Sequence, residues 1–451
     1  MFLDLTISMG SMNFRYLTTL RNKPIRAGTA IGKRRLIPLL IAFCLLGQWR
    51  VCLAGENQDQ FRLSGFATIG FSKSSDSDLG HRRYVDQEGH FADAWTPKTD
   101  SLLGLQIDAA ISNAVSATLQ LVGRERAQNT LEDSIEWAYF RYRFNDKLSF
   151  RAGRISNDLF MLSDYRNIGF AYLWVRPPME FYAPIGYEHI AGGDARYAQK
   201  LGRGIFSIKI FAGNSESKFE FDGESRSFDV NNVQGFNLAW ESDTWRIRYG
   251  LFSLDFDNSI NGAFSTKQFR SALLQAVPFG WAEAEQIASD ITADNNGITY
   301  NALGVSFDHY PWLLQAEINY YQSDYDLLKD YSGKYLSLGY RVGDLTFYTI
   351  NSRGSPEEAA TQVAELPPPL AQVPQFIQLQ QAVQTLYDST LLDQETWAIG
   401  ARWNLSYNAA MKIQWDKTRV QPEGTVLWKV KEPISKERDI DIFSLTFDFV
   451  F

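Results

Sequence analysis

The sequence predicts an all-β fold, a membrane-spanning antiparallel β-barrel of about 16 strands with short periplasmic turns and long external loops. Segments of about ten residues alternate between apolar and polar side chains, as expected for a strand with one face in lipid and one in a lumen. Short and long connections follow each other regularly between these segments. The longest apolar run, Leu36–Leu46, has 11 residues and is too short for a membrane-spanning helix.

The composition excludes several classes of protein. The chain has 451 residues, 45% of them hydrophobic and 14% aromatic, which is too apolar for a disordered chain. A net charge of −8 argues against nucleic-acid binding, which needs a basic surface. Two cysteines exclude a disulfide scaffold and a cysteine-based zinc cluster.

Residues 1–54 are predicted to be a signal peptide with an extended basic region. Basic residues at 33–35 precede the apolar run, and Ala54 ends a small-residue cleavage site. Because the basic region is long, a start at Met9 or Met12 stays open, and a soluble amphipathic arm is the alternative to a signal. Both cysteines lie in this segment, whose charge is +7, so the remaining 397 residues are cysteine-free with a net charge of −15.

The predicted strands follow one another through residues 55–451, the predicted barrel domain. The last one shows the alternation best, because every second residue from Phe443 to Phe451 is apolar, with Ser444, Thr446 and Asp448 between them. The predicted strands are 60–72, 100–111, 114–125, 134–144, 147–155, 190–200, 204–214, 232–241, 244–256, 297–308, 311–322, 333–341, 345–351, 395–404, 409–418 and 438–451.

The connections between the strands are sorted by length. Short turns centre on 112–113, 145–146, 201–203, 242–243, 309–310, 343–344 and 406–407, whereas 73–99, 156–189, 257–296 and 352–394 are long. Helix-like stretches lie at 281–290 and 376–386 in the two longest loops. A soluble β-sandwich has no reason to sort its connections in this way, but an outer-membrane barrel does.

Alternation places outward-facing aromatic residues at the periplasmic level. Such residues form a girdle at each membrane interface of a barrel. The predicted members are Phe61, Phe144, Trp240, Trp245, Phe307, Trp312, Phe347, Trp403 and Phe451.

Alternation also assigns charged side chains to the lumen. An Arg or Lys facing lipid at the midplane costs about 2–4 kcal/mol, so strand cations must face the lumen or lie at the rims. A ring of cations favours a passing anion, which predicts a modest anion preference. The predicted pore-lining residues are Arg124, Arg141, Arg151, Lys209, Arg246, Arg248, Lys412, Asp108 and Glu317.

The features above resemble those of Gram-negative outer-membrane porins. A signal peptide, sixteen strands, a terminal Phe with alternating aromatics and a long loop after the fifth strand carry this resemblance. The sequences 136–139 (Glu-Trp-Ala-Tyr) and 148–154 are similar to porins near the phosphate-selective and dicarboxylate-channel groups. The chain differs from them in lacking an N-terminal coiled-coil arm and a Lys-rich loop.

The resemblance implies a passive diffusion channel for small hydrophilic solutes in the bacterial outer membrane. It implies a homotrimer, contact with outer-membrane lipid and lipopolysaccharide, and an assembly signal at Phe447, Phe449 and Phe451 for the barrel-assembly machinery. In porins the long third external loop folds inward and sets the constriction. Here that loop is 156–189, with Asp158, Asp164, Glu180 and Glu188 as its acidic groups. The alternative is an external loop packed on its neighbours.

Two other functions stay open at this stage. An outer-membrane enzyme of the lipase or protease type needs a Ser–His pair oriented by an acid, and the sequence offers none that can be recognised. A structural or adhesive barrel plugged by its own loops is the other alternative. The four histidines lack metal-ligand spacing, so neither a metal nor a cofactor is expected, and the chain is predicted not to be an enzyme.

Overall fold

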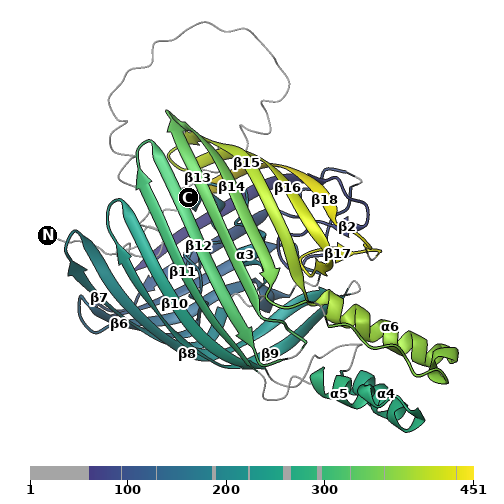
Figure 1. The fold of residues 1–451 in the computed structure, drawn as a ribbon. Coiled ribbons are helices and arrows are strands. Elements are labelled where there is room, and N and C mark those ends of the chain that lie inside the picture. Colours follow the sequence, from purple (N-terminus) through teal and green to yellow (C-terminus); the bar gives the residue numbers. More distant parts are fainter. Residues whose placement is uncertain are drawn as a thin grey trace, which may run out of the picture.

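The barrel is closed by a continuous ring of antiparallel strands (Figure 1). The computed structural model describes residues 60–92, 94–127, 130–184, 189–221, 224–256, 266–291, 297–325, 327–359, 361–432 and 434–451, so the predicted signal peptide lies outside them. The ring runs β1-β18-β16-β15-β14-β13-β12-β11-β10-β9-β8-β7-β6-β5-β4-β3. The sixteen-strand prediction is therefore confirmed.

Each barrel strand coincides with one predicted segment. The barrel strands are β1 Phe61–Ser74, β3 Leu102–Ala110, β4 Val115–Arg124, β5 Ile135–Arg143, β6 Leu148–Ser156, β7 His189–Leu201, β8 Gly204–Phe221, β9 Glu224–Glu241, β10 Trp245–Phe256, β11 Gly297–His309, β12 Trp312–Ser323, β13 Tyr331–Val342, β14 Leu345–Pro356, β15 Leu392–Ser406, β16 Ala409–Thr425 and β18 Arg438–Val450.

One pair of strands extends well beyond its predicted ends. β8 and β9 continue their ladder from Ser215↔Val230 to Phe221↔Glu224, whereas the sequence predicted a loop between 214 and 232. The extension is polar at most of its positions, so it lacks the apolar face on which the alternation depends. The hairpin therefore rises past the part of the barrel that carries the lipid-facing pattern.

The outer surface of the barrel is apolar. Outward-facing side chains such as Leu103, Leu105, Ile107, Ile399 and Ile413 are exposed around the ring. Because the barrel is closed, each of its strands is hydrogen-bonded to a neighbouring strand on both sides. None of the helices in the described ranges is long and apolar enough to cross a bilayer.

Aromatic side chains gather at the ends of the strands that join the short turns. Trp245 packs on Phe307 with ring centroids 4.7 Å apart, and Trp312 packs on Tyr340 at 4.8 Å. Phe61, Phe144, Phe347, Trp403 and Phe451 are exposed at the same level. This arrangement agrees with the predicted aromatic girdle.

The long connections carry additional elements at the opposite end of the barrel. β2 Leu79–Gly80 pairs with β17 Lys429–Val430, which ties the first long loop to the last. Helices α4 Thr266–Ala276, α5 Glu283–Asp290 and α6 Pro374–Ser389 project from the rim (Figure 1). The remaining short helices are α2 Leu131–Ser134, η2 Gly169–Ala171, α3 Met179–Tyr182, η3 Val277–Phe279 and η4 Leu370–Gln372.

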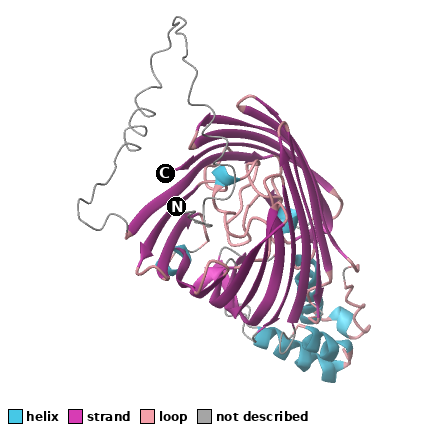
Figure 2. Ribbon diagram, turned by 90° about the vertical axis from the view of Figure 1, so that its left-hand side faces the viewer, coloured by secondary structure: helices cyan, strands magenta, loops and turns pink. Residues whose placement is uncertain are grey.

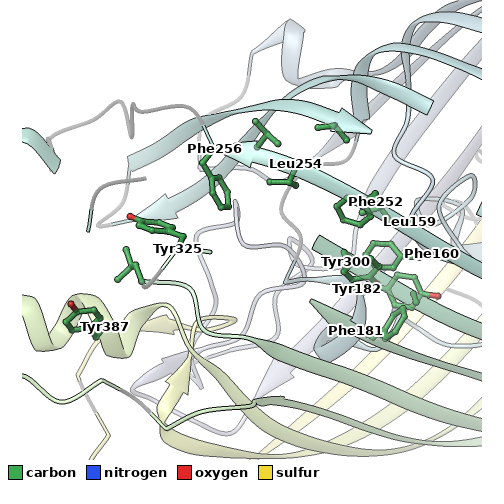
Figure 3. Packing of buried hydrophobic residues seen from close by; sticks show 14 of the residues in the cluster. Leu159, Phe160, Phe181, Tyr182, Phe252, Leu254, Phe256, Tyr300, Tyr325 and Tyr387 are labelled. Carbon is green, nitrogen blue, oxygen red and sulfur yellow. The ribbon is translucent and has the colours of Figure 1, made fainter. Parts of the chain in front are cut away.

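A hydrophobic cluster joins the interior of the barrel to its external rim. Phe160 packs on Phe181 and Tyr300, with ring centroids 5.5 and 6.1 Å apart, and Tyr300 packs on Phe252 at 4.8 Å (Figure 3). Phe252 and Tyr300 belong to β10 and β11, whereas Phe160 and Phe181 belong to the connection between β6 and β7. The long connection after β6 therefore packs on the inner face of the wall at β10 and β11.

The carboxyl-terminal residue completes the closure of the barrel. The backbone of Phe451 exchanges two hydrogen bonds of 2.9 Å with Gly65 of β1, and β18 pairs with β1 from Ile442 to Val450. Phe447 and Phe449 lie on the outward face of β18, opposite Ile69 and Ala67.

We predict that deletion of Phe451 lowers the yield of the folded barrel, because it removes both terminal hydrogen bonds and one girdle ring. The heat-modifiable shift in electrophoretic mobility measures the folded fraction. Tyr407→Ala is the control, since this aromatic side chain is exposed in a turn between β15 and β16. A normal yield without Phe451 contradicts both the closing role and the proposed assembly signal.

Candidate functional site

Residues 157–184, here called the inner loop, lie inside the barrel. Figure 2 looks into the barrel and shows loop segments enclosed by the ring of strands. Phe160, Leu162, Trp174, Phe181 and Glu180 are almost completely buried. The inner loop contacts strands around most of the ring, so it is not an external loop that rests on its neighbours.

The first anchor of the inner loop is Asp158. Its carboxylate accepts hydrogen bonds from Lys209 Nζ on β8, from Arg248 Nη2 on β10 at 2.6 Å and from Asn237 Nδ2 on β9 at 2.9 Å. Lys209 is buried and Arg248 is mostly so. One loop acid therefore neutralises two cations of the wall.

Arg176 anchors the inner loop to the other side of the barrel. Its guanidinium donates to Asp100 at 3.0 and 2.8 Å, to Asp416 of β16 at 2.7 Å and to Ser444 of β18 at 2.5 Å. Burial acts to raise the pKa of the Asp100 carboxyl, but the adjacent Arg176 outweighs it and holds this pKa below its ordinary value.

Two buried glutamates connect the inner loop to a third part of the wall, formed by β12, β14 and β15. Glu180 of α3 accepts hydrogen bonds from Ser352 at 2.6 Å, from Gln394 at 2.7 Å and from Thr396. Glu317 of β12 accepts from the backbone N–H of Met161 at 3.0 Å and from the Tyr182 and Tyr335 hydroxyls. Both carboxylates are therefore satisfied by polar groups of the loop and the wall.

A lysine of β16 holds the middle of the inner loop. Lys412 Nζ donates to the carbonyl oxygens of Gly169 and Trp174, both at 2.6 Å, and pairs with Asp448 at 3.1 Å. Gly169 makes this close approach possible, because a Cβ there would lie 2.2 Å from the Asp448 Oδ1 atom.

The predicted pore-lining residues fall into two groups. Lys209, Arg248, Glu317 and Lys412 lie beneath the inner loop and bind it, and Arg246 donates to the Tyr165 hydroxyl of the same loop at 3.0 Å. These residues face inward as predicted, but they contact protein groups. The second group, on β3 to β6, is not covered in this way.

The second group lies on the wall that the inner loop leaves most open. Asp108 of β3 accepts from Thr118 at 2.8 Å, and Arg151 of β6 pairs with Asp194 of β7 at 2.5 Å. Arg141 of β5 is half-buried, lies next to Arg151 in the ladder and has its guanidinium 5.9 Å from the centre of the Tyr139 ring. Arg124 lies at the external end of β4, paired with Asp86 at 2.7 Å.

Two further cations lie on this wall. Arg196 of β7 is half-buried beside Lys209 of β8 in the ladder, and Arg143 is exposed at the end of β5. The sequence did not single out Arg196, because Gly192 and Gly193 obscure the alternation of its strand. We call Arg141, Arg143, Arg151 and Arg196 the arginine wall. In the described part of the chain, only Arg151 among them forms an ion pair.

The predicted acids of the constriction loop have partners. Asp158 and Glu180 are anchors, and Asp164 accepts from the Ser156 hydroxyl at 2.8 Å. Glu188 lies outside the described residues. The described ranges contain no cluster of three or more residues suited to hold a metal ion.

No protein-family model and no curated protein matches the sequence. Among solved structures, an anion-selective porin from Comamonas acidovorans is similar at 12% identity, with 87% of this chain and 99% of that chain covered and a TM-score of 0.50. The outer membrane channel DcaP of Acinetobacter baumannii is similar at 10% identity, with 88% and 99% covered and a TM-score of 0.50.

These likenesses show the fold, which is that of a porin-like barrel. A closed antiparallel barrel with an apolar exterior and aromatic ends places the chain in the bacterial outer membrane. The expected fold class and location are thus confirmed, whereas the roles of individual lumen residues remain predictions.

We predict that Asp158→Asn lowers the free energy of unfolding by about 3–5 kcal/mol, because it leaves two cations without their buried carboxylate. Urea unfolding of the refolded barrel in lipid measures the change. Asp146→Asn, at an exposed position in the β5–β6 turn, is the matched control. Equal stability of both variants and the wild-type chain would show that Asp158 does not anchor the loop.

Proposed function

We propose that this chain is a passive diffusion channel for small hydrophilic solutes, with a modest preference for anions. The observation that carries the proposal is the arginine wall, in which Arg141, Arg143 and Arg196 are exposed or half-buried and Arg151 is mostly buried. On the opposite wall, Ser337, Thr346, Lys412 and Thr446 face the lumen and are buried. Solutes are therefore expected to pass along β5 to β7, beside the inner loop.

The charge of the arginine wall supports the anion preference. Asp194 offsets Arg151, and Arg141, Arg143 and Arg196 form no ion pair with a described residue. Uncompensated cations lining a passage in a low-dielectric wall lower the energy of an anion there. The preference is modest because Asp194 cancels one of the four cations, and the Arg62–Asp108 pair, 3.4 Å apart, adds no net charge.

Several predictions from the sequence belong to the same proposal. Removal of residues 1–54 delivers the chain to the outer membrane, and Phe447, Phe449 and Phe451 form the signal for the barrel-assembly machinery. The assembled barrel is a homotrimer in contact with lipopolysaccharide. Electrophoresis of the unheated, detergent-extracted barrel tests the trimer directly.

A plugged structural or adhesive barrel is the second candidate. The dense anchoring of the inner loop favours it, because Asp158, Arg176, Glu180 and Lys412 tie the loop to strands on several sides. An outer-membrane enzyme is the third, and a lipid-hydrolysis assay on the refolded chain tests it.

Conductance separates the channel from the plugged barrel. We expect residues 55–451, refolded and inserted in a planar bilayer, to give stepwise openings whose reversal potential in a salt gradient is directed to anions. A cation-directed potential keeps the channel and refutes the anion preference. A correctly folded barrel without openings favours the plugged alternative.

We predict that Arg141→Ser combined with Arg196→Ser moves the reversal potential toward cations, because it removes two uncompensated charges from the arginine wall. Lys417→Ser is the control, since this lysine lies on the outward face of β16, in the same row as Trp415 and Ile413. An unchanged reversal potential in the double variant would place the arginine wall away from the conduction path.

A further inference from the structure

A polar cavity of about 270 Å³ opens at the external end of β4 to β8. Its walls come from the loop before β5, from the ends of β5, β6 and β7, and from the extended hairpin strand β8. Pockets for drug-sized ligands measure roughly 300–1,000 Å³, so this cavity suits a smaller molecule. It lies at the external end of strands that, further along, carry the arginine wall.

Most charged groups that line the cavity are paired with each other. Arg124 donates two hydrogen bonds to Asp86, at 2.7 and 2.9 Å, and Arg126 lies 3.6 Å from the same carboxylate. Lys218 pairs with Asp133 at 2.5 Å. The charges within these pairs neutralise each other, so these groups attract a charged ligand only weakly.

Arg154 is the exception among the cations. Its Nη2 atom lies 3.3 Å from Nδ1 of His189, its Nε atom is buried without a hydrogen-bond partner, and it forms no ion pair with a described residue. Strict alternation from Arg151 would send Arg154 to the lipid face. The ladder keeps its register through Gly153, which has a φ of 131°, so Arg154 shares the outward row with its exposed partners Ala138 and Ala191, whereas Ile155 is buried. The cavity therefore lies on the outer side of the external rim.

Glu132 is the corresponding exception among the acids. It lies in the first turn of α2, is exposed and lines the same cavity. Its carboxylate makes no hydrogen bond or ion pair with a described residue. The carboxylates of Glu136 and, less strongly, Glu132 act on Arg154 across the cavity, and Arg154 and Glu132 form no ion pair with each other. A molecule that carries both charges can bridge them.

We propose that this cavity is an external binding site for an amino-acid-sized zwitterion, with its carboxylate on Arg154 and its ammonium group on Glu132. A guanidinium and a carboxylate form strong, charge-assisted hydrogen bonds. The site gives the proposed channel a substrate class and rests on that function, because capture at the external mouth serves passage through the barrel.

The test uses three probes of matched size on the refolded residues 55–451. L-Alanine carries both charges, propionate lacks the ammonium group, and ethylamine lacks the carboxylate. We expect isothermal titration calorimetry to show binding of L-alanine and at least tenfold weaker binding of each single-charge probe. Equal affinities for the three probes would overturn the proposal.

Two variants assign the two charges of the ligand. Arg154→Gln is expected to remove the advantage of L-alanine over ethylamine, and Glu132→Gln its advantage over propionate. Arg270→Gln and Glu365→Gln are matched controls, because both residues are exposed in other external loops. If Arg154→Gln fails to fold, the exposed Glu132→Gln decides. Unchanged affinities in the folded variants would place the zwitterion elsewhere.

Conductance on the same preparation keeps the two proposals apart. L-Alanine binding with stepwise openings supports both. Openings without alanine binding retain the channel and overturn the zwitterion site. Alanine binding by a folded barrel that never opens retains the site and overturns the channel.

Discussion

The pairing of buried charges between the inner loop and the barrel wall determines how much of the lumen is open. In a low-dielectric interior an unpaired ion costs several kcal/mol, so each cation on a lumen-facing strand needs a partner or water. The inner loop supplies Asp158 for Lys209 and Arg248, and backbone carbonyls for Lys412. Where the loop does not reach, on β5 to β7, water must solvate the cations.

The same pairing makes the inner loop a fixed part of the barrel. Its anchors lie on β8 and β10, on β12, on β14 and β15, and on β16 and β18, so they hold the loop from several sides. Breaking any one of these contacts leaves a buried charge without its partner. Gradual displacement of the inner loop from the wall is therefore energetically unfavourable. Selectivity should therefore depend on the static wall opposite the loop.

The sequence predicts the strands well. Each strand has one face in lipid and one in the lumen, so apolar and polar side chains alternate along it. It predicts the direction of Lys209, Arg248 and Lys412 for the same reason. It does not predict their partners, since Asp158 and Arg248 are 90 residues apart and only the path of the inner loop brings them together. Two nearby glycines obscure the alternation at Arg196. The sequence also does not place Arg154 beside Glu132, because the cavity between them depends on the packing of the loop before β5.

The external cavity and the arginine wall share strand β6. Arg154 and Arg151 are three positions apart, and a strand rises about 3.3 Å per residue, so their Cα atoms are about 10 Å apart along the strand and their side chains point to opposite faces. A zwitterion held with its carboxylate on Arg154 and its ammonium on Glu132 therefore lies on the outer side of the rim, and the strands separate it from the arginine wall. Capture of a dipolar solute and preference for anions thus depend on different charges: the first on Arg154 and Glu132 beside the external mouth, and the second on the arginine wall inside the lumen.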